Sequence, residues 1–168
     1  INGFGRIGRN VLRAIVESGR TDIEVVAVND LGPVETNAHL IRYDSVHGRF
    51  GQACTGEGDT LKVGDKSIAF RSEREPEKVD WGKLGVDIVL ECTGVFRKGP
   101  DAKAHIDAGA KKVIISAPGK EVDGTYVWGV NHTDYTGSED VISAASCTTN
   151  SLAPVAKVLD DAFGIERG

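Results

Sequence analysis

The chain has 168 residues, of which 40% are hydrophobic and 27% are charged, proportions typical of a soluble globular protein. Its formal net charge of -5 offers no electrostatic reason to expect nucleic acid as the main partner. No apolar run approaches the roughly 20 residues of a membrane span, and no charged-then-apolar leader opens the chain. We therefore expect a cytoplasmic protein with no membrane partner.

The predicted elements alternate between short β-branched runs and helical stretches, which is typical of a parallel sheet flanked by helices. The sequence thus predicts an α/β fold of the Rossmann type, with a doubly wound, mainly parallel sheet and helices on both faces. In chain order we expect a helix over 7–18, a strand over 24–29, a hairpin of 61–63 and 67–70, a strand over 87–92, a helix over 102–110, strands over 112–116, 127–130 and 141–144, and an amphipathic helix over 152–163. Pro154 complicates the start of the last helix, because proline is well tolerated only in a helix's first turn.

A glycine-rich turn stands close to the start of the sequence. Gly3, Gly5 and Gly8 form a GxGxxG motif, whose glycines permit a tight turn, the approach of a pyrophosphate and the packing of helix on strand. Ile1 precedes this turn by two residues, so we expect most of the preceding strand to be missing and the sequence to be a portion of a longer protein.

Asp30 follows the strand over 24–29, about twenty residues beyond the motif, where a ribose-binding acid is expected. Its carboxylate would accept the ribose hydroxyls and repel a 2′-phosphate, which favours NAD over NADP. An isolated aspartate after a strand is more often only a turn or cap residue, but the motif, the helix and the strand before it favour the functional interpretation.

The three cysteines, Cys54, Cys92 and Cys147, are far apart, with no CxxC pair and no histidine cluster at zinc spacing. This predicts neither a disulfide framework nor a metal site. Cys147 follows a predicted strand and precedes the last helix, and a thiol at a helix N-terminus is favoured as the thiolate. A buried cysteine beside a capping serine or threonine fits the spacing alone at least as well.

Eight motifs in order resemble the first half of the glyceraldehyde-3-phosphate dehydrogenase family, and together they run through essentially the whole chain. They are INGFGRIGRN, VVAVND, YDSVHGRF, SEREP, ECTGVF, AGAKKVIISAPGK, GVNH and SCTTNSLAPVAKVL. The SCTTN motif is highly specific. Two positions depart from the family pattern: Ser151 stands where many relatives have a second cysteine, and Ala144 where the family often has asparagine.

The resemblance implies an NAD-dependent enzyme of glycolysis or gluconeogenesis, assembled as a homotetramer. It would convert glyceraldehyde 3-phosphate and inorganic phosphate to 1,3-bisphosphoglycerate through a thiohemiacetal and a thioester on Cys147. By the same resemblance, Ser146 and Thr148 contact phosphate, and the backbone N–H of Cys147 helps to hold the oxyanion.

The resemblance also assigns cofactor contacts beyond the glycines and Asp30. Arg6 and Ile7 match residues over the pyrophosphate, and Arg74 matches a residue near the adenine, although a solvated surface arginine remains an alternative there. Thr93, Phe96 and Ser116 match further NAD contacts.

The resemblance divides the chain into a dinucleotide-binding domain over 1–146 and, over 147–168, the cysteine with the first helix of a catalytic domain. It places the family's general-base histidine beyond residue 168, so we expect the segment alone to be inactive. The histidines present share a position before the cysteine and are expected to be surface or structural residues: His39, His47, His105 and His132.

Two other functions stay open. Erythrose-4-phosphate dehydrogenase shares SCTTN, but Asp30 and Ala117 favour the glycolytic enzyme, since that relative more often has glutamate and histidine at these positions. An inactive NAD-binding module is the alternative if the protein consists of these residues only.

Overall fold

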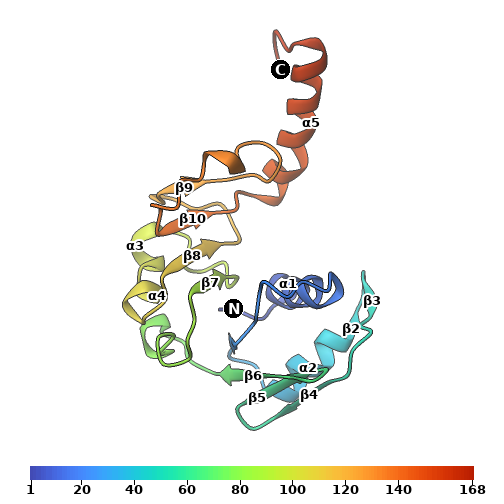
Figure 1. Ribbon diagram of the computed structural model, residues 1–168, viewed down its shortest axis with the longest axis vertical. Coiled ribbons are helices and arrows are strands. Elements are labelled where there is room, and N and C mark those ends of the chain that lie inside the picture. The colour runs from blue at the N-terminus through green and yellow to red at the C-terminus, as the bar shows by residue number, and fades with distance from the viewer.

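The computed structural model describes residues 1–168. The elements in chain order are α1 (Arg6–Glu17), β1 (Ala27–Asn29), α2 (Val34–Arg42), β2 (Tyr43–Asp44), β3 (Gly48–Arg49), β4 (Cys54–Glu57), β5 (Thr60–Val63), β6 (Lys66–Arg71), η1 (Pro76–Lys78), β7 (Ile88–Glu91), α3 (Gly99–Ala102), α4 (Ala104–Asp107), β8 (Lys112–Ile115), β9 (Gly124–Thr125), η2 (His132–Asp134), β10 (Val141–Ser143) and α5 (Cys147–Phe163). The arrangement is the α/β, Rossmann-type fold that the alternating pattern predicts (Figure 1).

Eight of the strands form two four-stranded groups, in the orders β1-β6-β5-β4 and β7-β8-β10-β9, and β2 and β3 form a separate antiparallel pair. The second group is parallel throughout, whereas β6, β5 and β4 form an antiparallel meander beside β1. Residues 1–3 connect the groups, because Asn2 makes parallel bridges to Asn29 of β1 and Glu91 of β7. The start of the glycine-rich turn is therefore hydrogen-bonded to both groups of strands, and these bonds fix its position relative to β1 and β7.

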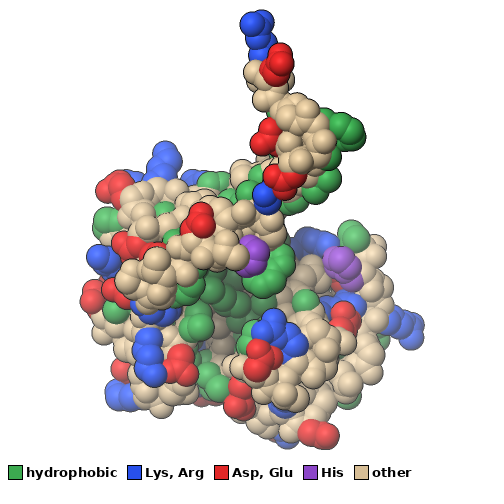
Figure 2. Space-filling model, turned by 45° about the horizontal axis from the view of Figure 1, so that its top comes forward, with side chains coloured by type: hydrophobic (Ala, Val, Ile, Leu, Met, Phe, Trp, Pro, Cys, Tyr) green, Lys and Arg blue, Asp and Glu red, His purple; other side chains and the backbone are tan.

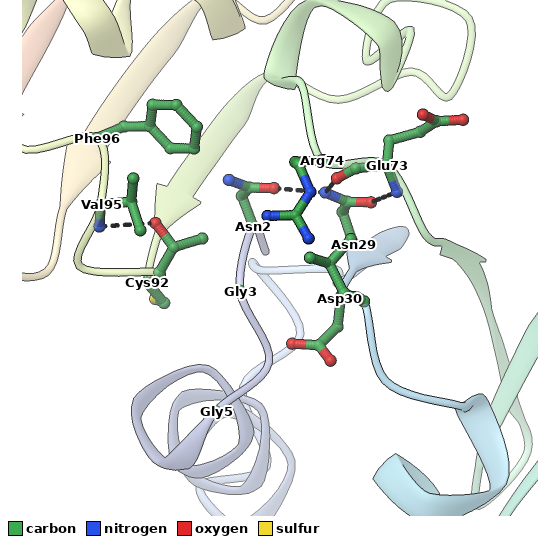
Figure 3. A pocket seen from close by; sticks show the side chains of 12 residues that line it. Asn2, Gly3, Gly5, Asn29, Asp30, Glu73, Arg74, Cys92, Val95 and Phe96 are labelled. Carbon is green, nitrogen blue, oxygen red and sulfur yellow. Dashed lines mark hydrogen bonds between the residues drawn. The ribbon is translucent and has the colours of Figure 1, made fainter.

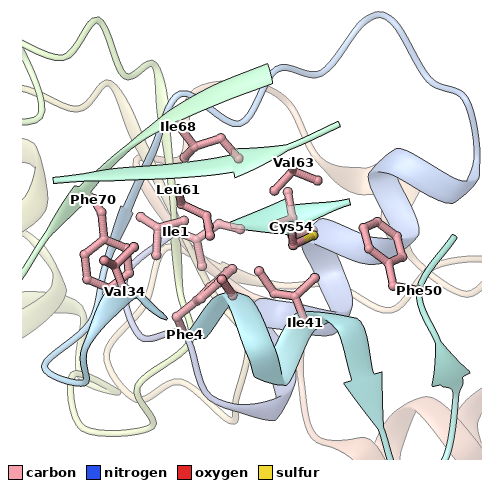
Figure 4. Packing of buried hydrophobic residues seen from close by; sticks show 13 residues of the cluster. Ile1, Phe4, Val34, Ile41, Phe50, Cys54, Leu61, Val63, Ile68 and Phe70 are labelled. Carbon is pink, nitrogen blue, oxygen red and sulfur yellow. The ribbon is translucent and has the colours of Figure 1, made fainter. Parts of the chain in front are cut away.

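Each group of strands packs its own hydrophobic cluster. The first cluster of 13 buried residues joins α1, α2 and strands β1 and β4–β6, with Phe4 and Leu61 completely buried (Figure 4). The second, of 11 buried residues, surrounds β7 and β8 and includes the fully buried Trp81 and Val113. The glycine-rich turn and the segment after β7 are thus each mounted on a packed core.

Helix α5 differs from the other α-helices because none of its residues is buried. Figure 1 shows it extending from the rest of the molecule, and Figure 2 shows hydrophobic side chains uncovered along it. Its exposed hydrophobic residues include Leu152, Val155 and Phe163. The helix begins at Cys147 instead of residue 152 and continues through Pro154. None of the helices is both long enough and apolar enough to cross a lipid bilayer.

The predicted strand over 127–130 is wrong, because this segment turns. The side chain of Asn131 accepts a hydrogen bond from Val127 N at 2.8 Å and donates one to Thr125 O at 3.0 Å. Gly129 has a φ of 79°, which also favours a turn. Strand β9 lies just before it, at Gly124–Thr125.

The predicted helix over 102–110 is interrupted and ends early. Two short helices, α3 and α4, stand in its place, and Lys103 separates them. Gly109 follows with a φ of 102°, and a Cβ there would lie 2.7 Å from Gly82 N. The chain must therefore leave the helix where it passes close to Gly82.

Candidate functional site

A cavity of about 380 Å³ opens where β1 and β7 end, beside the glycine-rich turn (Figure 3). Six of its lining residues were predicted from the sequence as cofactor contacts: Gly3, Gly5, Asp30, Arg74, Thr93 and Phe96. This position, at the carboxyl ends of strands that belong to different groups, is where open α/β sheets bind dinucleotides.

Glycine is required at different positions of the turn for different structural reasons. A Cβ at Gly3, whose φ is 84°, would lie 2.6 Å from Thr93 N, and one at Gly8 would lie 2.3 Å from Gly3 O. Gly5 has no neighbouring atom within 4 Å of that position, so its outer side is open. Gly5 is also the N-cap of α1, with no side chain capping the helix. The turn therefore offers backbone N–H groups at a positive helix end to an anionic ligand.

Asp30 contacts this turn directly. Its Oδ2 accepts a hydrogen bond from Phe4 N at 2.7 Å, and its Oδ1 accepts one from Gly32 N at 2.9 Å. The side chain is only partly buried and lines the cavity. Asn37 Nδ2 also donates to Oδ1, at 3.3 Å. A carboxylate has about four acceptor positions, so these three donors leave one open to a ligand hydroxyl. Arg74, across the cavity, is exposed.

Four of the residues predicted to contact the cofactor do not line this cavity. Arg6 is in the first turn of α1 and pairs with Asp44, with 3.1 Å between Nη1 and Oδ2. Ile7 is half exposed in the same turn, and Gly8 is buried against Gly3. Ser116 follows β8 and donates its backbone N–H to Glu91 O at 3.0 Å.

Several polar residues that the motif analysis did not single out also line the cavity. They are Asn2, Asn29 and Glu73, and Asn29 is hydrogen-bonded to both of the others (Figure 3). Cys92 lines it as well. Asn2 directly precedes the first glycine and Asn29 directly precedes Asp30, so adjacency to the predicted residues was the signal that could have identified them.

Cys147 is the first residue of α5 and is exposed, outside the lining of the cavity. Ser146 caps the helix, and its Oγ accepts a hydrogen bond from Thr149 N at 2.8 Å. Thr148 follows in the first turn and is also exposed. The capping role that the sequence left open thus belongs to Ser146, whereas Cys147 is not a buried cysteine.

The backbone before Cys147 is strained and firmly supported. Ala145 has a φ of 61°, which is unfavourable for a residue with a side chain. Ser143 Oγ accepts from Ala145 N at 3.0 Å, and Asn150 Nδ2 donates to Ala144 O at 2.8 Å and to Ser146 O at 2.9 Å. These bonds fix the direction in which the chain enters α5, and with it the position of the thiol.

The other two thiols are less accessible. Cys54 is 2% exposed in the first hydrophobic cluster, and Cys92 is half-buried. Burial raises the pKa of both thiols above the ordinary cysteine value. Because nucleophilic attack requires an accessible thiolate, Cys147 is the best placed of the three to react.

None of the four histidines forms a hydrogen bond with Cys147. His105 is completely buried and bonded to Trp81 and Glu91. The ring of His39 is tilted by 46° against that of Tyr43, with 4.9 Å between their centroids, and the ring centroid of His132 lies 4.2 Å from that of Trp128. His47 is exposed. These positions agree with the expected surface or structural roles.

Comparison with known proteins identifies both parts of the chain. A family model described as "Glyceraldehyde 3-phosphate dehydrogenase, NAD binding domain" matches residues 1–99. Another, described as "Glyceraldehyde 3-phosphate dehydrogenase, C-terminal domain", matches residues 146–168.

Among curated relatives, glyceraldehyde-3-phosphate dehydrogenase of Xanthobacter flavus is 63% identical over 168 residues, which is all of this chain and 50% of the relative. The Cereibacter sphaeroides protein of the same name is 60% identical over the same share of each chain. Glyceraldehyde-3-phosphate dehydrogenase 1 of Bacillus subtilis is 57% identical over 169 residues, again all of this chain and 50% of the relative. The chain thus spans about half the length of the curated relatives it matches.

Proposed function

The chain belongs to the glyceraldehyde-3-phosphate dehydrogenase family, and from this premise we propose that the protein oxidises glyceraldehyde 3-phosphate with NAD and inorganic phosphate to 1,3-bisphosphoglycerate. The observation that carries the proposal is an exposed thiol, Cys147, at the start of α5 in a chain that also builds a dinucleotide cavity. Family membership alone supports a cytoplasmic homotetramer in glycolysis or gluconeogenesis.

The residues of the cavity fit NAD. The open side of Gly5 and the uncapped N-terminus of α1 would hold the pyrophosphate, with Arg6 and Ile7 in the same turn. Asp30 would accept a ribose hydroxyl. Arg74 would lie near the adenine, and the other predicted contacts, Thr93, Phe96 and Ser116, lie on the β7 and β8 side. NAD, when bound there, supplies the hydride acceptor.

Cys147 would attack the aldehyde carbon, forming a carbon–sulfur bond and a thiohemiacetal. The backbone N–H of Cys147 would stabilise the oxyanion, and Ser146 and Thr148 would contact phosphate. Departure of hydride from the thiohemiacetal carbon, with loss of its hydroxyl proton, leaves a thioester. Attack by inorganic phosphate then breaks the carbon–sulfur bond, releases the acyl phosphate and returns the thiolate.

The proton of the thiohemiacetal requires a base, and no histidine of residues 1–168 is bonded to Cys147. We infer that a group outside these residues accepts this proton, and that residues 1–168 alone do not catalyse the reaction. The uncovered apolar face of α5 supports the same inference, since it leaves the helix that carries Cys147 without packing partners. It also supports a division into a dinucleotide-binding domain over 1–146 and the start of a catalytic domain over 147–168.

The substrate is tested by comparing glyceraldehyde 3-phosphate with erythrose 4-phosphate on the full-length enzyme. We expect kcat/KM to be higher for glyceraldehyde 3-phosphate by about 10-fold or more, a discrimination typical of one additional carbon in a fitted site. NADH formation should stop beyond the first turnover when phosphate is omitted. A preference for erythrose 4-phosphate would replace the proposed substrate with the alternative one.

A further inference from the structure

A buried carboxylate lies behind the wall of the cavity. Glu91, at the end of β7, is 1% exposed. Its Oε1 accepts hydrogen bonds from the backbone N–H of Thr93 at 2.7 Å and from the Thr93 hydroxyl. Its Oε2 accepts from Asn2 Nδ2 at 2.6 Å and interacts with His105 Nε2 at 2.9 Å. Four groups thus meet at one side chain that forms no part of the cavity lining.

The direction of the bond from His105 is fixed by Trp81. The indole Nε1 of Trp81 lies 3.0 Å from His105 Nδ1, and both rings are completely buried. An indole nitrogen only donates, so His105 Nδ1 accepts and carries no proton. His105 Nε2 therefore carries the ring's proton and donates a hydrogen bond to Glu91 Oε2.

The direction of the bond from Asn2 is fixed by the backbone on the opposite side. Glu73 N donates to Asn29 Oδ1, and Asn29 Nδ2 donates to Glu73 O, each at 2.8 Å, which orients the Asn29 amide. The same Nδ2 donates to Asn2 Oδ1 at 2.7 Å. Asn2 must therefore present its Nδ2 to Glu91. Only a group that accepts and never donates satisfies all four partners, and a carboxylate is such a group.

This network joins three walls of the cavity. Asn2 precedes Gly3 of the glycine-rich turn, Thr93 follows β7, and Glu73 precedes Arg74. Gly3 lies so close to Thr93 that no side chain fits between them. The hydrogen bonds to Glu91 therefore set the spacing between the turn and Thr93. A buried polar network of this kind is rigid when fully bonded and loses that rigidity when one partner is mismatched.

We propose that Glu91, oriented by His105 and Trp81, is a positioning residue for NAD, which rests on the proposed function of this cavity. It acts through Thr93 and Asn2 without touching the cofactor. The carboxylate holds the glycine-rich turn, the end of β7 and the segment carrying Arg74 at the separation that the dinucleotide requires. Replacing Glu91 is expected to raise the Kd for NAD more than a core substitution that lowers the unfolding temperature by a similar amount.

The test is Glu91→Gln in the full-length enzyme. The variant keeps the shape of the side chain but directs an NH₂ group at donors whichever way the amide turns. We expect the Kd and KM for NAD to rise by about 10-fold or more, the equivalent of about 1.4 kcal/mol or more, because buried donors are left unpaired. The KM for the aldehyde should stay within about twofold, since Cys147 does not contact this network.

Val89→Ala is the matched control, because Val89 is fully buried on the same face of β7 and forms no side-chain hydrogen bond. It should lower the unfolding temperature and leave the Kd for NAD within about twofold. Trp81→Phe removes the donor that orients His105 together with part of the buried indole ring, so its loss of stability is to be compared with that of Val89→Ala. It should raise the Kd for NAD by a smaller factor than Glu91→Gln, and it replaces that variant if the latter does not fold.

The inference is overturned if the network variants change NAD affinity no more than Val89→Ala does at a similar loss of thermal stability. It is also overturned if they raise the KM values for NAD and aldehyde equally. Failure of the proposed function would look different, because the wild-type enzyme itself would then neither bind NAD nor oxidise the aldehyde.

Discussion

Replacing Cys147 with serine in the full-length enzyme is expected to lower kcat by about 10⁴-fold or more, the order of loss seen when an enzyme's nucleophile is removed. The serine hydroxyl is a far weaker nucleophile than a thiolate, and no base among residues 1–168 is bonded to position 147. The NAD Kd should stay within about twofold, because Cys147 lies outside the lining of the cavity. Steady-state NADH formation and NAD titration by calorimetry measure the two quantities.

Cys54→Ala is the control for this variant, since Cys54 is buried in the first hydrophobic cluster, and β4, which it begins, lies at the opposite end of the molecule from α5 (Figure 1). It is expected to retain the activity per folded molecule. If serine at position 147 supported turnover close to that of the wild type, the assignment of the nucleophile would be wrong, and a thiol such as Cys92 in the cavity would have to be reconsidered.

Replacing Asp30 with alanine is expected to weaken NAD binding and to shift the ratio of NADP to NAD use by about 10- to 100-fold towards NADP. The carboxylate at the end of β1 repels a 2′-phosphate, and apposed like charges in a binding site cost several kcal/mol. Alanine also leaves Phe4 N, which donates to Asp30 Oδ2 at 2.7 Å, without its partner. Both cofactors should therefore bind less well in absolute terms, and the ratio of kcat/KM values is the informative measurement.

Asp30→Asn removes the charge and keeps one of the two backbone hydrogen bonds, because the amide oxygen can still accept from Phe4 N while the amide nitrogen no longer accepts from Gly32 N. It should shift the cofactor ratio in the same direction with a smaller loss of NAD affinity. Asp87→Asn serves as the matched control, since Asp87 is an exposed residue just before β7, at the opposite end of that strand from Glu91. An unchanged NADP to NAD ratio in both Asp30 variants would remove Asp30 from the ribose site.

The elements that could be predicted from the sequence are those whose pattern is local. The hairpin of β5 and β6, helix α1 and strand β8 follow from alternating or helical spacing over a few residues. Helix α2 was not predicted, although its buried Val34, Ala38 and Ile41 have helical spacing, because it has only nine residues and carries a polar residue, Asn37, on its buried face. Strand β4 was also missed. Its Gly56 lies close to Val34, and such an approach has no signal in a strand's own residues.

The residues of the site also differ in whether the sequence alone could identify them. Gly3, Asp30 and Thr93 could be placed at the cavity because motif and resemblance identify them one residue at a time. The network around Glu91 could not, because Asn2 and Glu91 are 89 residues apart in the sequence and only the sheet brings them together. The one feature of the sequence that pointed to this network was Glu91 itself, an acidic residue that ends the otherwise apolar strand Ile88–Glu91. A charge buried there requires hydrogen-bonding partners.

The most direct test of the account is a single turnover of the full-length enzyme with glyceraldehyde 3-phosphate and NAD in the absence of phosphate. Hydride transfer from the thiohemiacetal should give a burst of NADH equimolar with active sites, and the thioester should remain on the enzyme. Mass spectrometry of peptides should find the acyl group on Cys147, and added phosphate should discharge it. Absence of the burst, or an acyl group on Cys54 or Cys92 instead, would contradict the proposed function.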